Sequence, residues 1–148
     1  MVRPTPINVL IAAPAVVVQT LGGALRELGV EVQGCTTPGE GEKQLARRFD
    51  LILVCYVFDD VHPYHFIGRI RHESANAQTP IVLVRALPVP LGKSQEWEIG
   101  TAYKSIGVDE FCNYSDVLHE KGSDQANEML RQCVSKVLHA PDKRQNRA

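Results

Sequence analysis

The sequence has no long hydrophobic run: no apolar stretch in its 148 residues approaches the roughly 18 residues that cross a bilayer as a helix. Its first residues, Met1-Val2-Arg3-Pro4, also lack the charged and then apolar layout of an export signal. We therefore expect a cytoplasmic protein with no membrane partner.

An excess of charge of one sign is missing as well. The sequence has 16 Lys and Arg and 17 Asp and Glu, for a formal net charge of -1. Non-specific binding to nucleic acid usually depends on a strongly cationic surface. No nucleic-acid partner is therefore expected.

Paired cysteines and the common catalytic loops do not occur. Cys35, Cys55, Cys112 and Cys133 lie far apart with no CxxC pair, which argues against a zinc site or a redox motif. The phosphate-binding GxGxxG and GxxxxGK loops and the hydrolase signatures GxSxG and HExxH are also missing. We expect free thiols, no cofactor, no bound metal and no enzymatic activity.

Five short apolar runs predict β-strands, and the most continuous of them, DLILVCYVF at 50–58, indicates a central strand covered on both faces. The predicted strands span residues 7–13, 30–33, 50–58, 81–86 and 109–114.

The length suits a single domain, expected over residues 1–139 with a short polar tail at 140–148.

Apolar residues at helical spacing follow each predicted strand. A first helix after residue 13 is closed by Gly29, and a second, over 40–49, turns Leu45 and Ala46 inward. A third helix starts near Pro63, and a fourth starts with Ser94 as N-cap and ends at Gly107. The inward residues of the last three helices are Phe66, Ile67 and Ile70, then Ile99, Ala102, Tyr103 and Ile106, and finally Ala126, Met129, Leu130, Cys133, Val134, Val137 and Leu138.

Strands that alternate with helices predict a doubly wound α/β sandwich of the flavodoxin type, because parallel strands need crossover connections. The expected five-stranded parallel sheet has the order 2-1-3-4-5. Ligands bind such sheets at the carboxyl ends of the strands, near the point where the winding direction reverses. The segments that follow the strands are therefore the candidates for a site.

In three fragments the chain resembles the receiver domain of bacterial two-component response regulators, the CheY-like family. The fragments are DLILVCYVFDDVHPYHFIGRIR at 50–71, TPIVLVRA at 79–86 and GVDEF at 107–111, and the resemblance spans roughly residues 7–138. It implies the same fold and a role in signal transduction. Family members accept a phosphoryl group on an aspartate after strand three, with Mg²⁺ held there by carboxylates.

All five positions that carry this chemistry in the family are changed here. The acidic pair corresponds to Ala13 and Pro14, the phospho-acceptor to Cys55, a Ser or Thr to Arg85, and a Lys to Tyr114. Ala and Pro cannot coordinate a cation, and a thiolate is a soft ligand that does not suit Mg²⁺. The resemblance therefore implies a degenerate, atypical member that takes no phosphate on an aspartate.

Several residues near these positions leave alternatives open. Asp59 and Asp60 are possible pocket carboxylates. Arg85 is expected either to pair with one of them and hold one conformation or to extend to solvent. Tyr114 packs over Cys55 or points outward, and Cys55 is either a packed hydrophobe or a reactive thiol.

These residues favour a stand-alone interaction module that works by protein–protein contact without phosphorylation. The resemblance places its partner face on the fourth helix, fifth strand and fifth helix, where Trp97, Tyr103 and Phe111 are the candidates, and this face allows a homodimer. Two alternatives are a redox-responsive receiver that uses Cys55 and a flavodoxin-like protein that binds a small ligand or cofactor.

Overall fold

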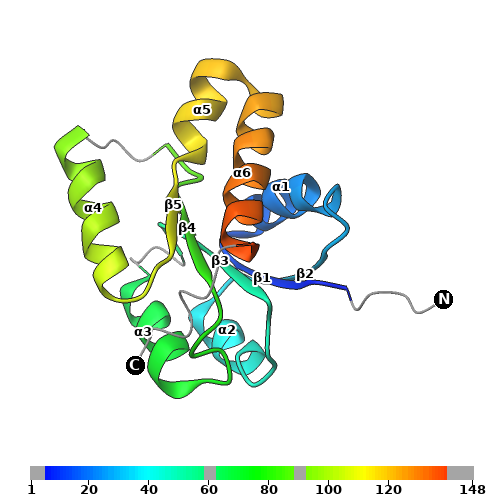
Figure 1. The fold of residues 1–148 in the computed structure, drawn as a ribbon, viewed down its shortest axis with the longest axis vertical. Helices are drawn as coiled ribbons and strands as arrows, with labels where there is room; N and C mark the ends of the chain where they lie inside the picture. The colour runs from blue at the N-terminus through cyan, green and yellow to red at the C-terminus, as the bar shows by residue number, and fades with distance from the viewer. Residues whose placement is uncertain (1–5, 59–62, 89–92, 140–148) are drawn as a thin grey trace.

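The computed structural model describes residues 6–58, 63–88 and 93–139, which form a parallel sheet with helices on both faces (Figure 1). The strands are β1 (Asn8–Ala12), β2 (Glu31–Cys35), β3 (Leu51–Cys55), β4 (Ile81–Val84) and β5 (Glu110–Cys112), in the order β2-β1-β3-β4-β5. The predicted fold class and strand order are confirmed.

Six helices occur among the described residues. They are α1 (Ala15–Arg26), α2 (Pro38–Gln44), α3 (Tyr64–Glu73), α4 (Lys93–Ser105), α5 (Tyr114–Lys121) and α6 (Ser123–Leu138). Within the described ranges, none of these helices is long and apolar enough to cross a membrane.

Two apolar layers hold the helices to the sheet. Alternate strand residues such as Val9 and Ile11 face α1 and α6, whereas Leu10 and Ile52 face α2, α3 and α4 (Figure 1). Every residue of β3 is buried, because this strand lies in the middle of the sheet and is covered on both faces. The continuous apolar run at 50–58 follows from that position.

The second helix is shorter than predicted and lies earlier in the chain. It begins at Pro38, with Thr37 as its N-cap, and ends at Gln44. Beyond it, Leu45 is buried but Ala46 is exposed, so the prediction that Ala46 points inward is wrong. The buried Asn76 side chain explains the early end, because it bonds to the backbone there: its amide donates to the carbonyls of Leu45 and Arg47 and its oxygen accepts from the Phe49 amide.

Helix α5 was not predicted. Asn113 caps it by accepting from the Asp116 amide, and Gly122, with a φ of 90°, separates it from α6. A capping pair three residues apart is a local signal for a helix start. Helix α4 also differs from expectation, since Ser94 lies inside it rather than at its N-cap and Ala102 is exposed.

A buried arginine joins the loops at the amino edge of the sheet. Arg71, near the end of α3, donates to the carbonyl oxygens of Thr79 at 2.6 Å and Gly107 at 2.7 Å, and to the Asp109 carboxylate at 3.2 Å. Asp109 in turn accepts from the Ile81 amide at 2.9 Å. The arginine therefore fixes the starts of β4 and β5 relative to each other.

Candidate functional site

The five positions singled out in the sequence lie at the carboxyl edge of the sheet. Ala13 and Pro14 follow β1, Cys55 ends β3, Arg85 follows β4, and Tyr114 begins α5 just after β5. Ladder pairing holds the edge together: Cys55 pairs with Val84, Val84 pairs with Cys112, and the Arg85 amide donates to the Cys112 carbonyl. The sheet therefore brings the five positions to one end of the fold.

Arg85 is a buried charged residue at this edge. Its side chain is only 7% exposed, and its guanidinium Nη1 donates to the Asp116 carboxylate at 2.6 Å and to the Asn113 side-chain oxygen at 3.0 Å. The expectation that Arg85 extends to solvent is wrong, because the chain folds α5 over it. Asp59 and Asp60, the partners considered from sequence, lie outside the described residues.

The contact with Arg85 also orders the start of α5. Asn113 donates to the second Asp116 oxygen at 2.8 Å, and the Ser115 amide donates to the Arg85 carbonyl at 2.8 Å. The Arg85 guanidinium holds the pKa of the Asp116 carboxyl below its usual value; partial burial opposes this shift and the Asn113 bond adds to it. Asp116 therefore carries a negative charge at neutral pH, in the first turn of α5, where the helix dipole favours an anion.

Asp116 and Asn113 were missed as site residues by the sequence reasoning. The signal that was available is local: an Asn followed three residues later by an Asp is a helix-start pattern. That pattern predicts the helix but not the arginine, which lies 31 positions before Asp116 in the chain.

Tyr114 points into the protein and not toward a partner. It is 2% exposed, it belongs to the apolar layer that also contains Ala13 and Cys55, and its hydroxyl donates to the Asn127 side chain on α6 at 2.5 Å. Burial raises the pKa of its phenol. The Tyr114 ring is therefore anchored inside the domain.

Cys55 is buried, with 1% of its surface exposed. Burial raises the pKa of its thiol, although contacts with the backbone at Val57 and Ala86 oppose the rise. Because the thiolate is the reactive form of cysteine, this environment disfavours nucleophilic chemistry at Cys55. The structure gives the redox alternative at Cys55 no support.

The residues at these positions do not fit a magnesium ion. Mg²⁺ takes oxygen ligands in octahedral geometry, whereas Ala13, Pro14 and Cys55 offer a methyl group, a ring and a sulfur. Within the described ranges, no group of three or more His, Cys, Asp or Glu side chains is placed to hold a metal ion. No step through a bound cation is derived from this site.

Solved structures that resemble this chain include response regulators and receiver domains. A chemotaxis response regulator from Vibrio cholerae matches with a TM-score of 0.67 and 20% identity, covering 90% of this chain and 99% of that chain. The phosphorylated cyanobacterial phytochrome response regulator RcpA matches with a TM-score of 0.69 and 14% identity, covering 91% and 96%. The chain has the receiver-domain fold.

A third match is a receiver domain whose structure contains a metal ion. The receiver domain of a sensor histidine kinase from Pseudomonas aeruginosa, with a magnesium ion coordinated in its active-site cleft, matches with a TM-score of 0.60 and 16% identity, covering 88% of this chain and 99% of that chain. No family model matches the sequence, and no curated protein matches it. At these identities the likeness establishes the receiver fold alone.

The candidates for a partner face of the receiver fold differ in their surroundings. Tyr103 is 6% exposed and packs its ring against Tyr56 and Tyr64, so little of it is open to a partner. Phe111 is half-buried on β5. Trp97 lies on α4, and its side chain is outside the described part of the structure.

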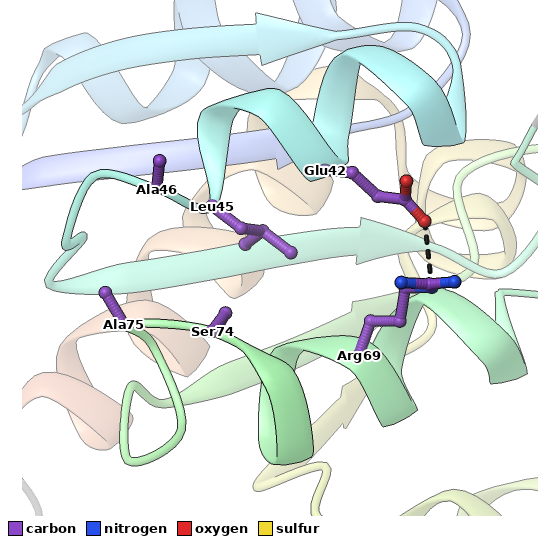
Figure 2. Close-up of a pocket in the computed structure, with 6 residues that line it drawn as sticks. All are labelled: Glu42, Leu45, Ala46, Arg69, Ser74 and Ala75. Atoms are coloured by element: carbon purple, nitrogen blue, oxygen red, sulfur yellow. Dashed lines mark ion pairs between the residues drawn. The ribbon is translucent and has the colours of Figure 1, made fainter.

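In the part of the chain that the structure describes, three cavities lie beside α3. Ala13, Cys55 and Arg85 are not among the residues that line these three. One, of about 380 Å³, lies between α2 and α3, where the Arg69 guanidinium and the Glu42 carboxylate form an ion pair at 2.9 Å (Figure 2). A groove of about 830 Å³ lies between α3 and the end of α4, and a small one of about 190 Å³ lies beside Phe66.

Proposed function

We propose that this chain is an atypical receiver domain of two-component-type signalling, which acts through protein contact and is not switched by phosphorylation of an aspartate. The observation that carries the proposal is the buried Arg85 guanidinium, bound to Asp116 and Asn113 at the edge where relatives handle phosphate. Because a guanidinium is always charged, Arg85 can hold one conformation of this edge without any covalent modification of the protein.

The neighbouring residues support the same reading. Ala13 and Cys55 are buried and supply no carboxylate, and Tyr114 is anchored to α6 through Asn127. In a switching receiver the groups at the ends of β4 and β5 must exchange partners when phosphate arrives. Here those groups already have partners within the domain, so the start of α5 is held in one arrangement.

The contact surface that we propose is built by α4, β5 and the helices that follow β5, with Trp97 and Phe111 as the candidate contact residues. Aromatic side chains are enriched at protein interfaces. The partner is a signalling protein or a second copy of the chain. The proposal assigns no nucleic-acid partner, no cofactor and no enzymatic activity.

A direct chemical test is incubation with acetyl phosphate or beryllofluoride in the presence of Mg²⁺. We expect no covalent phosphoryl adduct by intact mass spectrometry and no change in the amide NMR spectrum on addition of beryllofluoride. A receiver domain with its aspartate intact, treated in parallel, provides the positive control. A stoichiometric adduct that maps to Asp59, Asp60 or any other carboxylate would contradict the proposal.

The partner surface is tested by affinity capture from the native host. We expect that Trp97→Ala loses a specific protein that the wild type retains, because removing an interface aromatic commonly costs about 2 kcal/mol or more. Val16→Ala is the matched control, since Val16 is 63% exposed on α1, across the sheet from α4. Equal recovery by all three proteins would rule out Trp97 as a contact.

A further inference from the structure

Two pairs of side chains meet between β5 and α6. Glu110 and Cys112 are two residues apart on β5 and share one face of the strand, while Cys133 and Lys136 are three apart on α6 and share one face of the helix. The Lys136 ammonium lies 3.3 Å from the Glu110 carboxylate, and the Cys112 thiol donates a hydrogen bond to the Cys133 sulfur. The two cysteines, 21 positions apart in the chain, are therefore neighbours in the fold.

The two thiols differ in exposure and in the direction in which their pKa values are shifted. Cys112 is buried in the apolar layer beneath α6, and Cys133 packs against that layer but is only half-buried. The hydrogen bond from Cys112 lowers the pKa of Cys133; burial and Glu110 oppose this effect and Lys136 adds to it. The pKa of Cys112 is raised, first by the same hydrogen bond and then by burial. Cys133, which is more exposed and has the lower pKa of the two, is therefore the thiol expected to react first, and Cys112 is expected to react second.

We propose that Cys112 and Cys133 form an intramolecular disulfide when the protein meets hydrogen peroxide, so that the pair is an oxidative modification site. The Cys133 thiolate attacks one peroxide oxygen, the O–O bond breaks, and the released hydroxide takes a proton to become water, which leaves Cys133 as a sulfenic acid. Cys112 sulfur then attacks the Cys133 sulfur, the S–O bond breaks, and the hydroxide leaves with the Cys112 proton as a second water. Two thiols are oxidised and one peroxide is reduced.

The oxidation does not depend on the proposed contact function, although β5 and α6, which carry the two cysteines, are also part of the proposed contact surface. The disulfide closes a loop that contains the whole of α5. This loop begins at Cys112, whose carbonyl accepts a hydrogen bond from the Arg85 amide. The cross-link would therefore fasten α6 to β5 next to the edge that Arg85 occupies. Cys35 and Cys55 are both buried, and burial raises the pKa of Cys35 to about 12 and also raises the pKa of Cys55.

The test is a thiol map of the full chain after treatment with equimolar hydrogen peroxide. Remaining thiols are alkylated in denaturant and the protein is digested without reductant. We expect a cross-linked peptide that contains Cys112 and Cys133, alkylated Cys35 and Cys55, and loss of the cross-link on reduction. In Cys133→Ser, Cys112 should remain open to alkylation, whereas Cys35→Ala should form the cross-link as the wild type does.

Three outcomes would overturn the proposal. They are four alkylated cysteines after peroxide treatment, a Cys133 oxidised to sulfinic acid without a cross-link, and a disulfide that joins Cys133 of two chains. Each of these is read from the wild-type protein alone, so the test does not depend on the folding of a variant.

Discussion

Replacement of Arg71 by methionine is expected to lower the free energy of unfolding by about 3–5 kcal/mol, the cost of breaking a buried ion pair by removal of one partner. The Arg71 side chain is 7% exposed and that of Asp109 is 10% exposed. Without the guanidinium, the carbonyls of Thr79 and Gly107 lose a donor and the Asp109 carboxylate loses its cation. Each is then left partly unsatisfied where water has little access.

Denaturant unfolding followed by circular dichroism measures this loss, and a neighbouring arginine provides the control. Arg69 lies two residues earlier on α3, where its half-exposed side chain pairs with a half-exposed Glu42 (Figure 2). Because exposed ion pairs contribute little, Arg69→Met should change stability by less than about 1 kcal/mol. Equal losses in the two variants would show that Arg71 does not join the β4 and β5 starts as described.

Replacement of Arg85 by methionine is expected to cost about 2 kcal/mol, the range for hydrogen bonds that involve charged groups. The estimate stays below that for Arg71 because the Asp116 side chain is 50% exposed, so water replaces part of the lost interaction. The loss of protection at the start of α5 should be larger than the loss of stability of the whole domain. Amide hydrogen exchange at Asp116 should accelerate, since the Arg85 guanidinium holds the Asn113 side chain that caps this amide and the Asp116 carboxylate itself.

The pH dependence of stability separates charge from packing at this pair. The folded-state pKa of Asp116 is depressed, so its contribution is complete above the unfolded pKa of about 3.9 and is lost as the pH falls through the folded value. The wild type should therefore lose stability below about pH 4 more steeply than Asp116→Asn. Arg85→Met should show the same shallow slope as Asp116→Asn, because each variant removes one side of the pair.

A parallel loss of stability in all three proteins below pH 4 would contradict the role of the pair. If the slopes differ as expected, the result also bears on the proposed function, because it shows a charge interaction that persists through the physiological range. Such a result would support the proposal that Arg85 holds one conformation of the domain without phosphorylation.

The sequence by itself determined the class of the fold and the order of its strands. Apolar runs such as LILVC in β3 and the repeated spacing on α6 are local patterns, and the alternation of strand and helix leaves few ways to form a parallel sheet. The resemblance to receiver domains, and not the periodicity, singled out Ala13, Cys55 and Arg85 as site positions. The sequence did not reveal which contacts the side chains at these positions make.

The tertiary structure alone decided which polar groups meet. Arg85 contacts Asp116 across 31 positions, Arg71 contacts Asp109 across 38, and Asn76 contacts Phe49 across 27. No local pattern encodes such pairs, because their partners become neighbours only when separate strand ends and loops are packed together. The early end of α2 has the same origin, since the carbonyls of Leu45 and Arg47, just after the helix, are satisfied by the Asn76 side chain from a distant loop.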